Sequence, residues 1–278
     1  MNTRLANALR QLPAYIVLGL WTLLVATLIL WVLAASVSTT REIFSRTLLS
    51  SGLHWENYAV MLGEGGMARY LLNTIIYVGI SVVGVLVVSA PAAYALSRFE
   101  FPGKAAVAAM VRIGIGMPAI MLMIPLFMLF GRLGLTGNPI GLILVYIGTT
   151  VPFSTFFLTG FFASLPRELE EAATMDGAGP IRVFWNIMLP LARPGLATVT
   201  IFNFITLFNE YFWALIFANS QDNRTLSIGL EAVVQALRYS GNWAALFAAV
   251  NLVVLPTLIF FIWQSRRIIG GVTAGAVK

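Results

Sequence analysis

The chain has 278 residues, of which 59% are hydrophobic and only 10% are charged, with a formal net charge of +6. Soluble domains average about 25% charged residues, so the composition excludes an ordinary soluble protein and favours an all-α polytopic membrane protein. The positive charge is spread out rather than gathered in a block, which argues against a nucleic-acid partner. The absence of cysteine excludes disulfides, and a single histidine excludes a histidine-rich metal site.

Apolar runs of about 20 residues are long enough to cross the hydrocarbon core as helices. The sequence has six such runs, which predict one transmembrane domain over residues 1–278. The expected spans cover about residues 14–35, 70–95, 106–130, 140–163, 195–218 and 243–263. The first run could instead be a signal peptide, but it exceeds the 7–15-residue apolar core of such peptides, which favours a retained span.

Prolines interrupt the third expected span, at Pro118 and Pro125. Proline leaves a helix carbonyl without its donor and kinks a membrane helix. We therefore expect a bent helix, and the sequence leaves open whether the bend faces a pore or serves packing.

The fifth expected span contains Asn203, Asn209 and Glu210. Glu210 is the one acidic residue well inside an apolar run, and an intramembrane carboxylate is a functional-site candidate. Two roles remain open: Glu210 lines a substrate path near the outer gate, or it hydrogen-bonds a neighbouring helix. The three residues are the candidate path residues.

Between the fourth and fifth spans, residues 164–194 form a polar segment, which we call the hairpin. Seven of the chain's 28 charged residues fall within residues 165–194, too many to remain in hydrocarbon, where each central charge costs about 2.5–3.5 kcal/mol. Ser164 is expected to cap a helix that reaches about Met175, with Gly177 ending it in a left-handed conformation. Pro180 then starts a second helix, which Pro190 and Pro194 end.

One motif in the hairpin is more specific than its helices. Glu171-Ala172-Ala173, three residues, Gly177, nine residues and Ile187-x-Leu189-Pro190 resemble the EAA loop of ABC importer permeases. The resemblance implies that the hairpin docks on a separate cytoplasmic ATPase. The implied coupling residues are Glu171, Ala172, Ala173, Met175, Asp176, Gly177, Ile181, Phe184 and Pro190. The competing interpretation is an amphipathic helix that rests on the membrane surface.

Weaker signals resemble the smaller permease subunit of maltose-type carbohydrate importers. They are the Asn57-Tyr58 pair, the stretch 208–213 and the small-residue tail 268–278. In that family the tail contacts the ATPase subunits, which implies such a role for Thr273, Ala274 and Gly275; the alternative is a disordered tail. A short helix is expected within residues 219–242, either reaching a substrate-binding protein or lying flat on the bilayer.

The resemblance implies a type I ABC importer fold and half of a translocation pathway for a sugar or oligosaccharide, operated by alternating access. The implied partners are two ABC ATPase subunits, a second homologous permease, an extracytoplasmic solute-binding protein and the lipid bilayer. The sequence contains no G-x-x-x-x-G-K-[ST] phosphate loop. We therefore expect no enzyme activity, metal or cofactor in this chain, with ATP and Mg bound by the ATPase subunits.

Charge asymmetry predicts the orientation. With both termini in the cytoplasm, ten lysines and arginines fall in cytoplasmic segments and six in outer segments, which fits the positive-inside rule and a multi-pass protein of the inner membrane. The alternatives are an ABC importer permease for a non-sugar solute and an ion-coupled secondary carrier, which more often shows discontinuous helices and buried ion ligands. An intramembrane enzyme would need convergent catalytic groups, which the expected spans lack.

Overall fold

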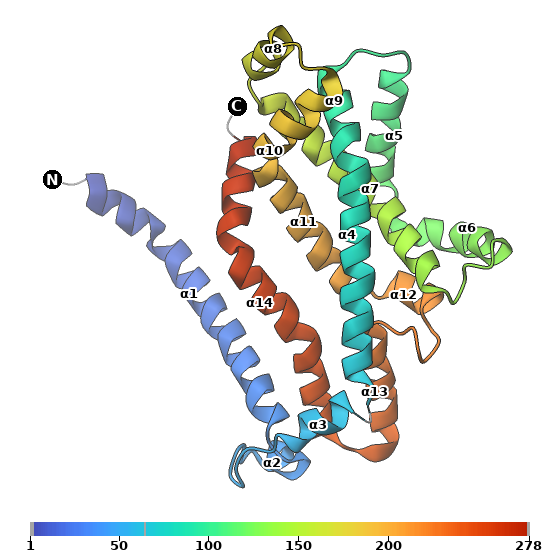
Figure 1. Ribbon diagram of the computed structural model, residues 1–278. Helices are drawn as coiled ribbons and strands as arrows, with labels where there is room; N and C mark the ends of the chain where they lie inside the picture. Colours follow the sequence, from blue (N-terminus) through green and yellow to red (C-terminus); the bar gives the residue numbers. More distant parts are fainter. Residues whose placement is uncertain (1–2, 64, 277–278) are drawn as a thin grey trace. The chain divides into compact units, whose positions relative to one another are not determined.

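The computed structural model describes residues 3–63 and 65–276, and within them every regular element is a helix (Figure 1). The elements are α1 (Thr3–Ser36), α2 (Thr40–Ser45), α3 (Glu56–Leu62), α4 (Met67–Arg98), α5 (Lys104–Gly116), α6 (Ala119–Arg132), α7 (Pro139–Ser164), α8 (Glu168–Met175), α9 (Pro180–Val183), the π-helical turn η1 (Phe184–Met188), α10 (Leu189–Leu191), α11 (Arg193–Phe208), α12 (Phe212–Phe217), α13 (Leu226–Ser240) and α14 (Trp243–Ala276).

The chain packs as two units. The first unit combines Met1–Ala68 with Leu230–Val254, and the second combines Arg69–Gly229 with Leu255–Lys278. Among the described residues, four helices are long and apolar enough to cross a membrane, at Gln11–Ser36, Met67–Arg98, Pro139–Ser164 and Trp243–Gln264. Two bent helix pairs raise this number to six if each pair counts as one span.

Helix α1 of the first unit exposes its apolar side chains on all sides over residues 11–28. No residue of its most apolar 18-residue window is buried, and Trp21 is 65% exposed. A helix that is apolar all round needs a lipid or protein environment. Its only described ring contact joins Trp31 to Phe247 of α14, with centroids 5.2 Å apart.

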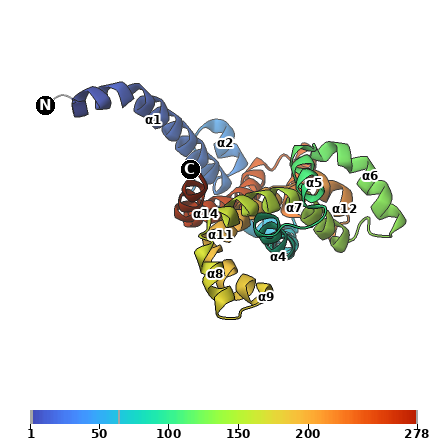
Figure 2. The same cartoon turned by 90° about the horizontal axis from the view of Figure 1, so that it is seen from above.

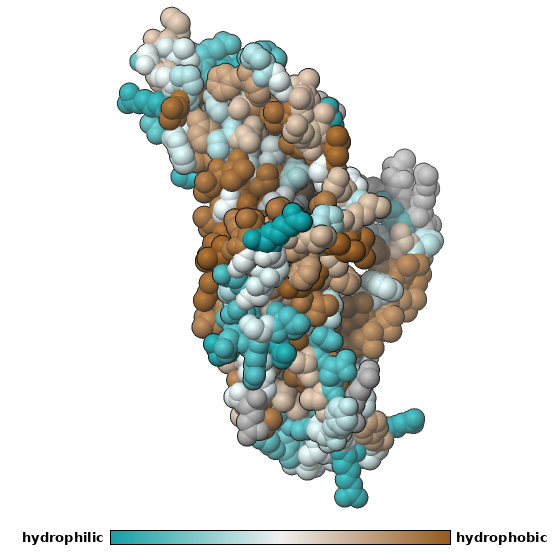
Figure 3. Space-filling model, turned by 90° about the vertical axis from the view of Figure 1, so that its right-hand side faces the viewer, coloured by the Kyte–Doolittle hydropathy of each residue, from teal (hydrophilic) through white to brown (hydrophobic). Residues whose placement is uncertain are grey.

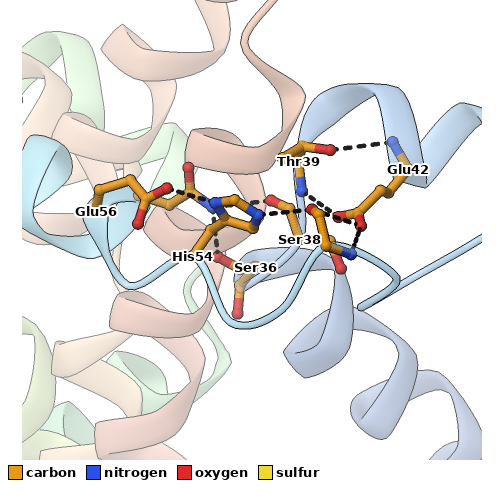
Figure 4. Close-up of polar contacts among 8 residues, drawn as sticks. Ser36, Ser38, Thr39, Glu42, His54 and Glu56 are labelled. Carbon is orange, nitrogen blue, oxygen red and sulfur yellow. Dashed lines mark hydrogen bonds and ion pairs between the residues drawn. The ribbon is translucent and has the colours of Figure 1, made fainter.

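A dense hydrogen-bond cluster follows α1 in the first unit (Figure 4). Glu42 and Thr39 form a capping box at the start of α2. The buried Glu42 carboxylate also accepts hydrogen bonds from the hydroxyls of Ser50 and Ser51 and from the Ser51 N–H. These bonds hold the pKa of Glu42 well below its usual range, with the Thr39 N–H as the largest cause. His54 extends the chain of contacts, with one ring nitrogen against Ser51.

The Asn57-Tyr58 pair, noted in the sequence only as a resemblance, lies at the start of α3 and fixes the loop between α1 and α3. The Asn57 amide donates to the carbonyls of Ser36 and Ser38, both at 3.0 Å. The Tyr58 hydroxyl lies 2.8 Å from Ser36 Oγ and accepts from Asn251 of α14 at 3.1 Å. The pair therefore fastens the loop to α1 and α14.

Two apolar clusters form the core of the second unit, and α4 and α7 contribute to both. One cluster joins these helices to α11 and α12, with Tyr146 and Phe217 among its fully buried members. The other joins them to the hairpin and includes Phe162 and Met188. Gly195 lets α11 approach α7 closely, because a Cβ there would lie 2.6 Å from the Phe161 ring.

The third expected span, residues 106–130, is not one helix. The axes of α5 and α6 differ by 106° across a break at Met117 and Pro118. Met117 is extended, with φ −80° and ψ 118°, because the ring of a following proline disfavours the α conformation. Pro125 lies inside α6 without ending it. Helix α6 exposes many apolar side chains, such as Ile124 at 71%. Figure 3 shows broad brown, hydrophobic areas on the face that it draws.

The fifth expected span, residues 195–218, is also wrong as a continuous helix. Helix α11 ends at Phe208, and α12 begins at Phe212. The last expected span agrees with the apolar stretch Trp243–Gln264, but its helix continues to Ala276. A separate non-helical tail is therefore not observed over residues 268–276.

Candidate functional site

The first arm of the hairpin is α8, which ends as the sequence predicts. Gly177 has φ +77°, and its N–H donates to the Thr174 carbonyl at 3.0 Å. The next N–H, of Ala178, reaches back to the Ala173 carbonyl at 3.0 Å. This pair of bonds is the Schellman motif, which satisfies the last helix carbonyls and requires a left-handed residue. The predicted left-handed end of the helix at Gly177 is confirmed.

The start of α8 differs from the prediction. Ser164 donates to the Phe161 carbonyl of its own helix α7 at 2.7 Å, so it does not cap α8. The N-cap position is Arg167, which makes no side-chain capping bond. Acidic side chains in the first turn, among them Glu168 and Glu170, favour this helix start electrostatically, because negative charge is favourable at a helix N-terminus.

The second arm of the hairpin is not a single regular helix. Pro180 occupies the first turn of α9, and a π turn over Phe184–Met188 follows. Pro190 lies inside α10 directly after this turn rather than ending the arm. Because proline has no N–H to donate, the irregular hydrogen bonding at this point fits its position. The arm then meets α11 at a bend of 71°.

Apolar side chains on the inner side fasten the hairpin to α4 and α7. Ala173, Val183, Phe184 and Met188 are buried in one cluster with residues of these helices. Phe184 is 6% exposed, and its ring centroid lies 5.2 Å from that of Tyr94. Phe184 therefore holds the hairpin in place, and the expectation that it offers a surface to an ATPase is wrong.

The outer side of the hairpin presents most of the other predicted coupling residues. Met175 is 88% exposed and Ile181 is 77% exposed, and Glu171, Ala172 and Asp176 are also exposed. Met175 and Ile181 therefore leave apolar area exposed beside acidic groups on this side of the hairpin. Figure 2 shows α8 and α9 projecting to one side of α4, α7 and α11.

An ion pair that sequence reasoning missed lies under α8. Arg98 Nε, at the end of α4, is 2.6 Å from Glu170 Oε1. Tyr94 donates its hydroxyl to Glu170 Oε2 at 3.1 Å, and Arg98 Nη2 donates to the Leu165 carbonyl at 2.7 Å. The spacing of Glu170 and Ala173, which places them on one face of α8, was the available signal that Glu170 points inward.

The candidate path residues have different surroundings. Asn203 is 3% exposed and donates to Ser154 of α7 at 2.9 Å, so it fastens two helices and does not line a path. Asn209 is exposed, and its side chain bonds the Ile205 carbonyl of its own helix. Glu210 accepts from the N–H groups of Trp213 and Ala214 at 2.8 and 3.1 Å, which starts α12.

Glu210 also accepts the Tyr146 hydroxyl of α7 at 3.0 Å, so its bond to a neighbouring helix is confirmed. The carboxylate also borders a cavity between the bent third segment, α7 and the break after α11. The lining residues are Pro118, Ala119, Ile120, Met123, Thr149, Thr150, Thr206, Leu207, Glu210, Phe212 and Trp213. A path-lining role for Glu210 therefore remains a prediction, alongside its structural role.

The predicted tail residues Thr273, Ala274 and Gly275 lie in the last turns of α14. Their side chains fall outside the described part of the chain. Within the described residues, no group of three or more histidine, cysteine, aspartate or glutamate side chains could hold a metal ion.

The sequence matches a known protein family and several of its members. Residues 59–267 match the family described as the inner membrane component of binding-protein-dependent transport systems. The chain is 38% identical over 267 residues to the diacetylchitobiose uptake system permease NgcG of Streptomyces coelicolor, covering 95% of this chain and 88% of the relative. It is 32% identical over 252 residues to the trehalose/maltose transport system permease MalG of Thermococcus litoralis, covering 90% of each.

A solved structure agrees with these relatives. The crystal structure of a bacterial ABC transporter that imports the acidic polysaccharide alginate superposes with a TM-score of 0.81 at 25% identity, covering 94% of this chain and 97% of that one. With its apolar helices and its EAA-type hairpin, the chain belongs to the family of inner membrane components of binding-protein-dependent transport systems and has the fold of a type I ABC importer permease.

Proposed function

We propose that this chain is one of two permease subunits of a carbohydrate ABC importer and that its hairpin receives the movement of an ATPase subunit. The observation that carries the proposal is the two-sided hairpin. Its inner side is fastened to α4 and α7 by Val183, Phe184 and Met188, while Met175 and Ile181 remain exposed on the other side.

The proposed transporter contains further subunits. An ATPase dimer binds and hydrolyses ATP with Mg and grips Glu171, Met175 and Ile181. The second permease completes the pathway, and a solute-binding protein delivers the substrate. Both termini and the hairpin lie in the cytoplasm, the arrangement that the positive-inside rule favours. The last turns of α14, residues 273–275, contact the ATPase dimer.

A sugar or oligosaccharide is the substrate class, because relatives that cover 90% or more of this chain transport diacetylchitobiose and trehalose or maltose. Glu210 and Asn209 border the path near its outer end. The cavity beside Glu210 also carries hydroxyls from Thr149, Thr150 and Thr206, which suits a hydroxyl-rich ligand.

Alternating access follows from rigid coupling. Closure of the ATPase dimer displaces the hairpin, and the helices fastened to it rotate as one body. The inner gate then closes while the outer gate opens towards the binding protein, and hydrolysis reverses the movement.

The test is reconstitution of the chain with its partner permease, ATPase subunits and binding protein in proteoliposomes. Radiolabelled diacetylchitobiose, trehalose and maltose serve as probes, with an amino acid as the non-sugar control. We expect uptake of a sugar that requires both ATP and the binding protein. Uptake by the purified chain alone, or uptake driven by an ion gradient without ATP, would refute the proposal in favour of a secondary carrier.

A further inference from the structure

The hairpin is joined to the helices of the second unit in two different ways. It is covalently continuous with α7 on one side and α11 on the other. Helix α4 is not adjacent to the hairpin in the chain, and its hydrogen bonds to the hairpin region join residues that are 67 and 76 positions apart. Movement of the hairpin must therefore reach α4 through non-covalent contacts.

Apolar packing supplies part of this connection, and three polar side chains add directional bonds to it. Both oxygens of the Glu170 carboxylate are engaged from α4, one by Arg98 Nε at 2.6 Å and the other by the Tyr94 hydroxyl at 3.1 Å. The Arg98 guanidinium also bonds the Leu165 carbonyl at 2.7 Å, just before α8. One arginine thus contacts both the base and the first arm of the hairpin.

Burial and helix polarity make this connection stiff. The side chains of Arg98 and Glu170 are 5% and 17% exposed, so water competes weakly for either charge. Arg98 lies in the last turn of α4 and Glu170 in the first turn of α8, the helix ends that favour a cation and an anion respectively. The Tyr94 ring packs against Phe99, Phe162 and Phe184, which fixes the hydroxyl in place.

The neighbouring acidic residues do not share this role. Glu168 and Glu171 lie in the same turn of α8 as Glu170, and both are exposed. The turn therefore separates its charges: Glu171 faces outward, where the EAA motif predicts a partner, and Glu170 faces α4.

We propose that Arg98, Glu170 and Tyr94 form a joint that makes α4 move with the hairpin, with each acting as a positioning residue for coupling. The inference rests on the proposed function, because it specifies how movement of the hairpin reaches α4, a helix that neither precedes nor follows the hairpin directly in the chain. Helix α4 contributes to both apolar clusters of the second unit. If the hairpin moved without α4, the other helices packed in these clusters would not move with it.

The first measurement is solute transported per ATP hydrolysed by the reconstituted transporter carrying Glu170→Gln, with Glu168→Gln as the matched control. We expect the Glu170→Gln complex to assemble and hydrolyse ATP but to transport at least about fivefold less solute per ATP, the lower end of typical coupling between sites. Glu168→Gln should retain the wild-type ratio. Arg98→Lys, which retains the cation, should recover part of the loss seen with Arg98→Gln.

The second measurement uses the absence of cysteine from the chain. Nitroxide labels on cysteines introduced at Val87 of α4 and Leu169 of α8, both exposed, report the distance between the two helices by pulsed electron paramagnetic resonance. In the wild-type background and with Glu168→Gln, we expect the same narrow distance with and without ATP. With Glu170→Gln, the distance should change between the two states.

The outcomes are separable. A wild-type ratio of transport to hydrolysis in Glu170→Gln, or an unchanged distance in both nucleotide states, overturns the joint. Failure of Glu170→Gln to assemble with the ATPase subunits also overturns it and shows a role in folding alone. Failure of the unmutated complex to transport a sugar would instead refute the proposed function.

Discussion

The hairpin and the break after α11 are two places where the second unit departs from regular helix, and each is built around a glutamate. Glu170 of the hairpin is paired with an arginine, Arg98, and a tyrosine hydroxyl. Glu210 at the break is held by the Tyr146 hydroxyl and two N–H groups at the start of α12. Among the described residues, no lysine or arginine forms an ion pair with Glu210.

The difference follows from the surroundings of each carboxylate. The hairpin is a charge-rich segment outside the apolar runs, so an arginine at the end of α4 can reach Glu170 without itself entering hydrocarbon. The break lies inside an apolar run, where a second charge would add a cost of about 2.5–3.5 kcal/mol or more. Backbone and hydroxyl donors satisfy Glu210 without that cost. The Arg98 cation therefore binds Glu170 strongly in the hairpin. At the break within the apolar run, neutral donors are sufficient to hold Glu210.

The largest effect should come from removing the cation. Arg98→Ala leaves Glu170 buried without its charged partner, and breaking such a pair typically costs about 3–5 kcal/mol. We expect a clear fall in the unfolding temperature of the detergent-solubilised chain. Arg182→Ala, which alters an exposed arginine on the same hairpin, should have little effect. Equal unfolding temperatures for the two variants would contradict the burial of the pair.

The turn that carries Glu170 provides the second test. Gly177→Val forces a β-branched residue into a left-handed conformation, at a cost of roughly 1–2 kcal/mol or more. Gly179→Val is the matched control, because neither glycine has an atom within 4 Å of its added Cβ, but only Gly177 has a positive φ. We expect both variants to insert into the membrane and only Gly177→Val to lose transport and transport-coupled ATPase activity. Equal transport by both would contradict docking through the hairpin.

A smaller effect is expected at the break. Glu210→Gln keeps one acceptor oxygen but turns an amide group towards N–H and hydroxyl donors, which costs about 1–3 kcal/mol for the unsatisfied groups. Asn209→Ala is the control, since among the described residues its side chain bonds the Ile205 carbonyl of its own helix. A structural role predicts a lower unfolding temperature for Glu210→Gln alone. Reduced sugar uptake in both variants at unchanged stability would instead favour a path-lining role.

Glu42 in the first unit extends the comparison to a third carboxylate, which in the described part of the chain is held by N–H and hydroxyl donors. Because folding lowers its pKa, its contribution to stability is complete above its unfolded pKa of about 4.3 and is lost as the pH falls through its lower folded pKa. The gap in unfolding temperature between wild type and Glu42→Gln should stay constant between pH 8 and about pH 5. It should narrow at lower pH; a gap that widened with acid would contradict this bonding.

Local sequence patterns were sufficient for much of this molecule. The apolar runs predicted the positions of α4 and α7 to within a few residues. The glycine of the EAA-type motif predicted the left-handed end of α8. These features depend on neighbouring residues, through hydropathy and through the freedom of glycine at positive φ. Pro118 indicated a bend, although the angle between α5 and α6 exceeds that of a kink within one span.

What the sequence by itself determined is therefore the class of the protein, the approximate helices and the hairpin that resembles an ATPase-coupling loop. Only the tertiary structure decided which polar side chains meet: Arg98 with Glu170, Asn203 with Ser154, and Glu210 with Tyr146. The physical reason is distance along the chain. The bonds of Asn203 and Glu210 cross 49 and 64 residues, and no local periodicity records which faces of two separate helices will pack together.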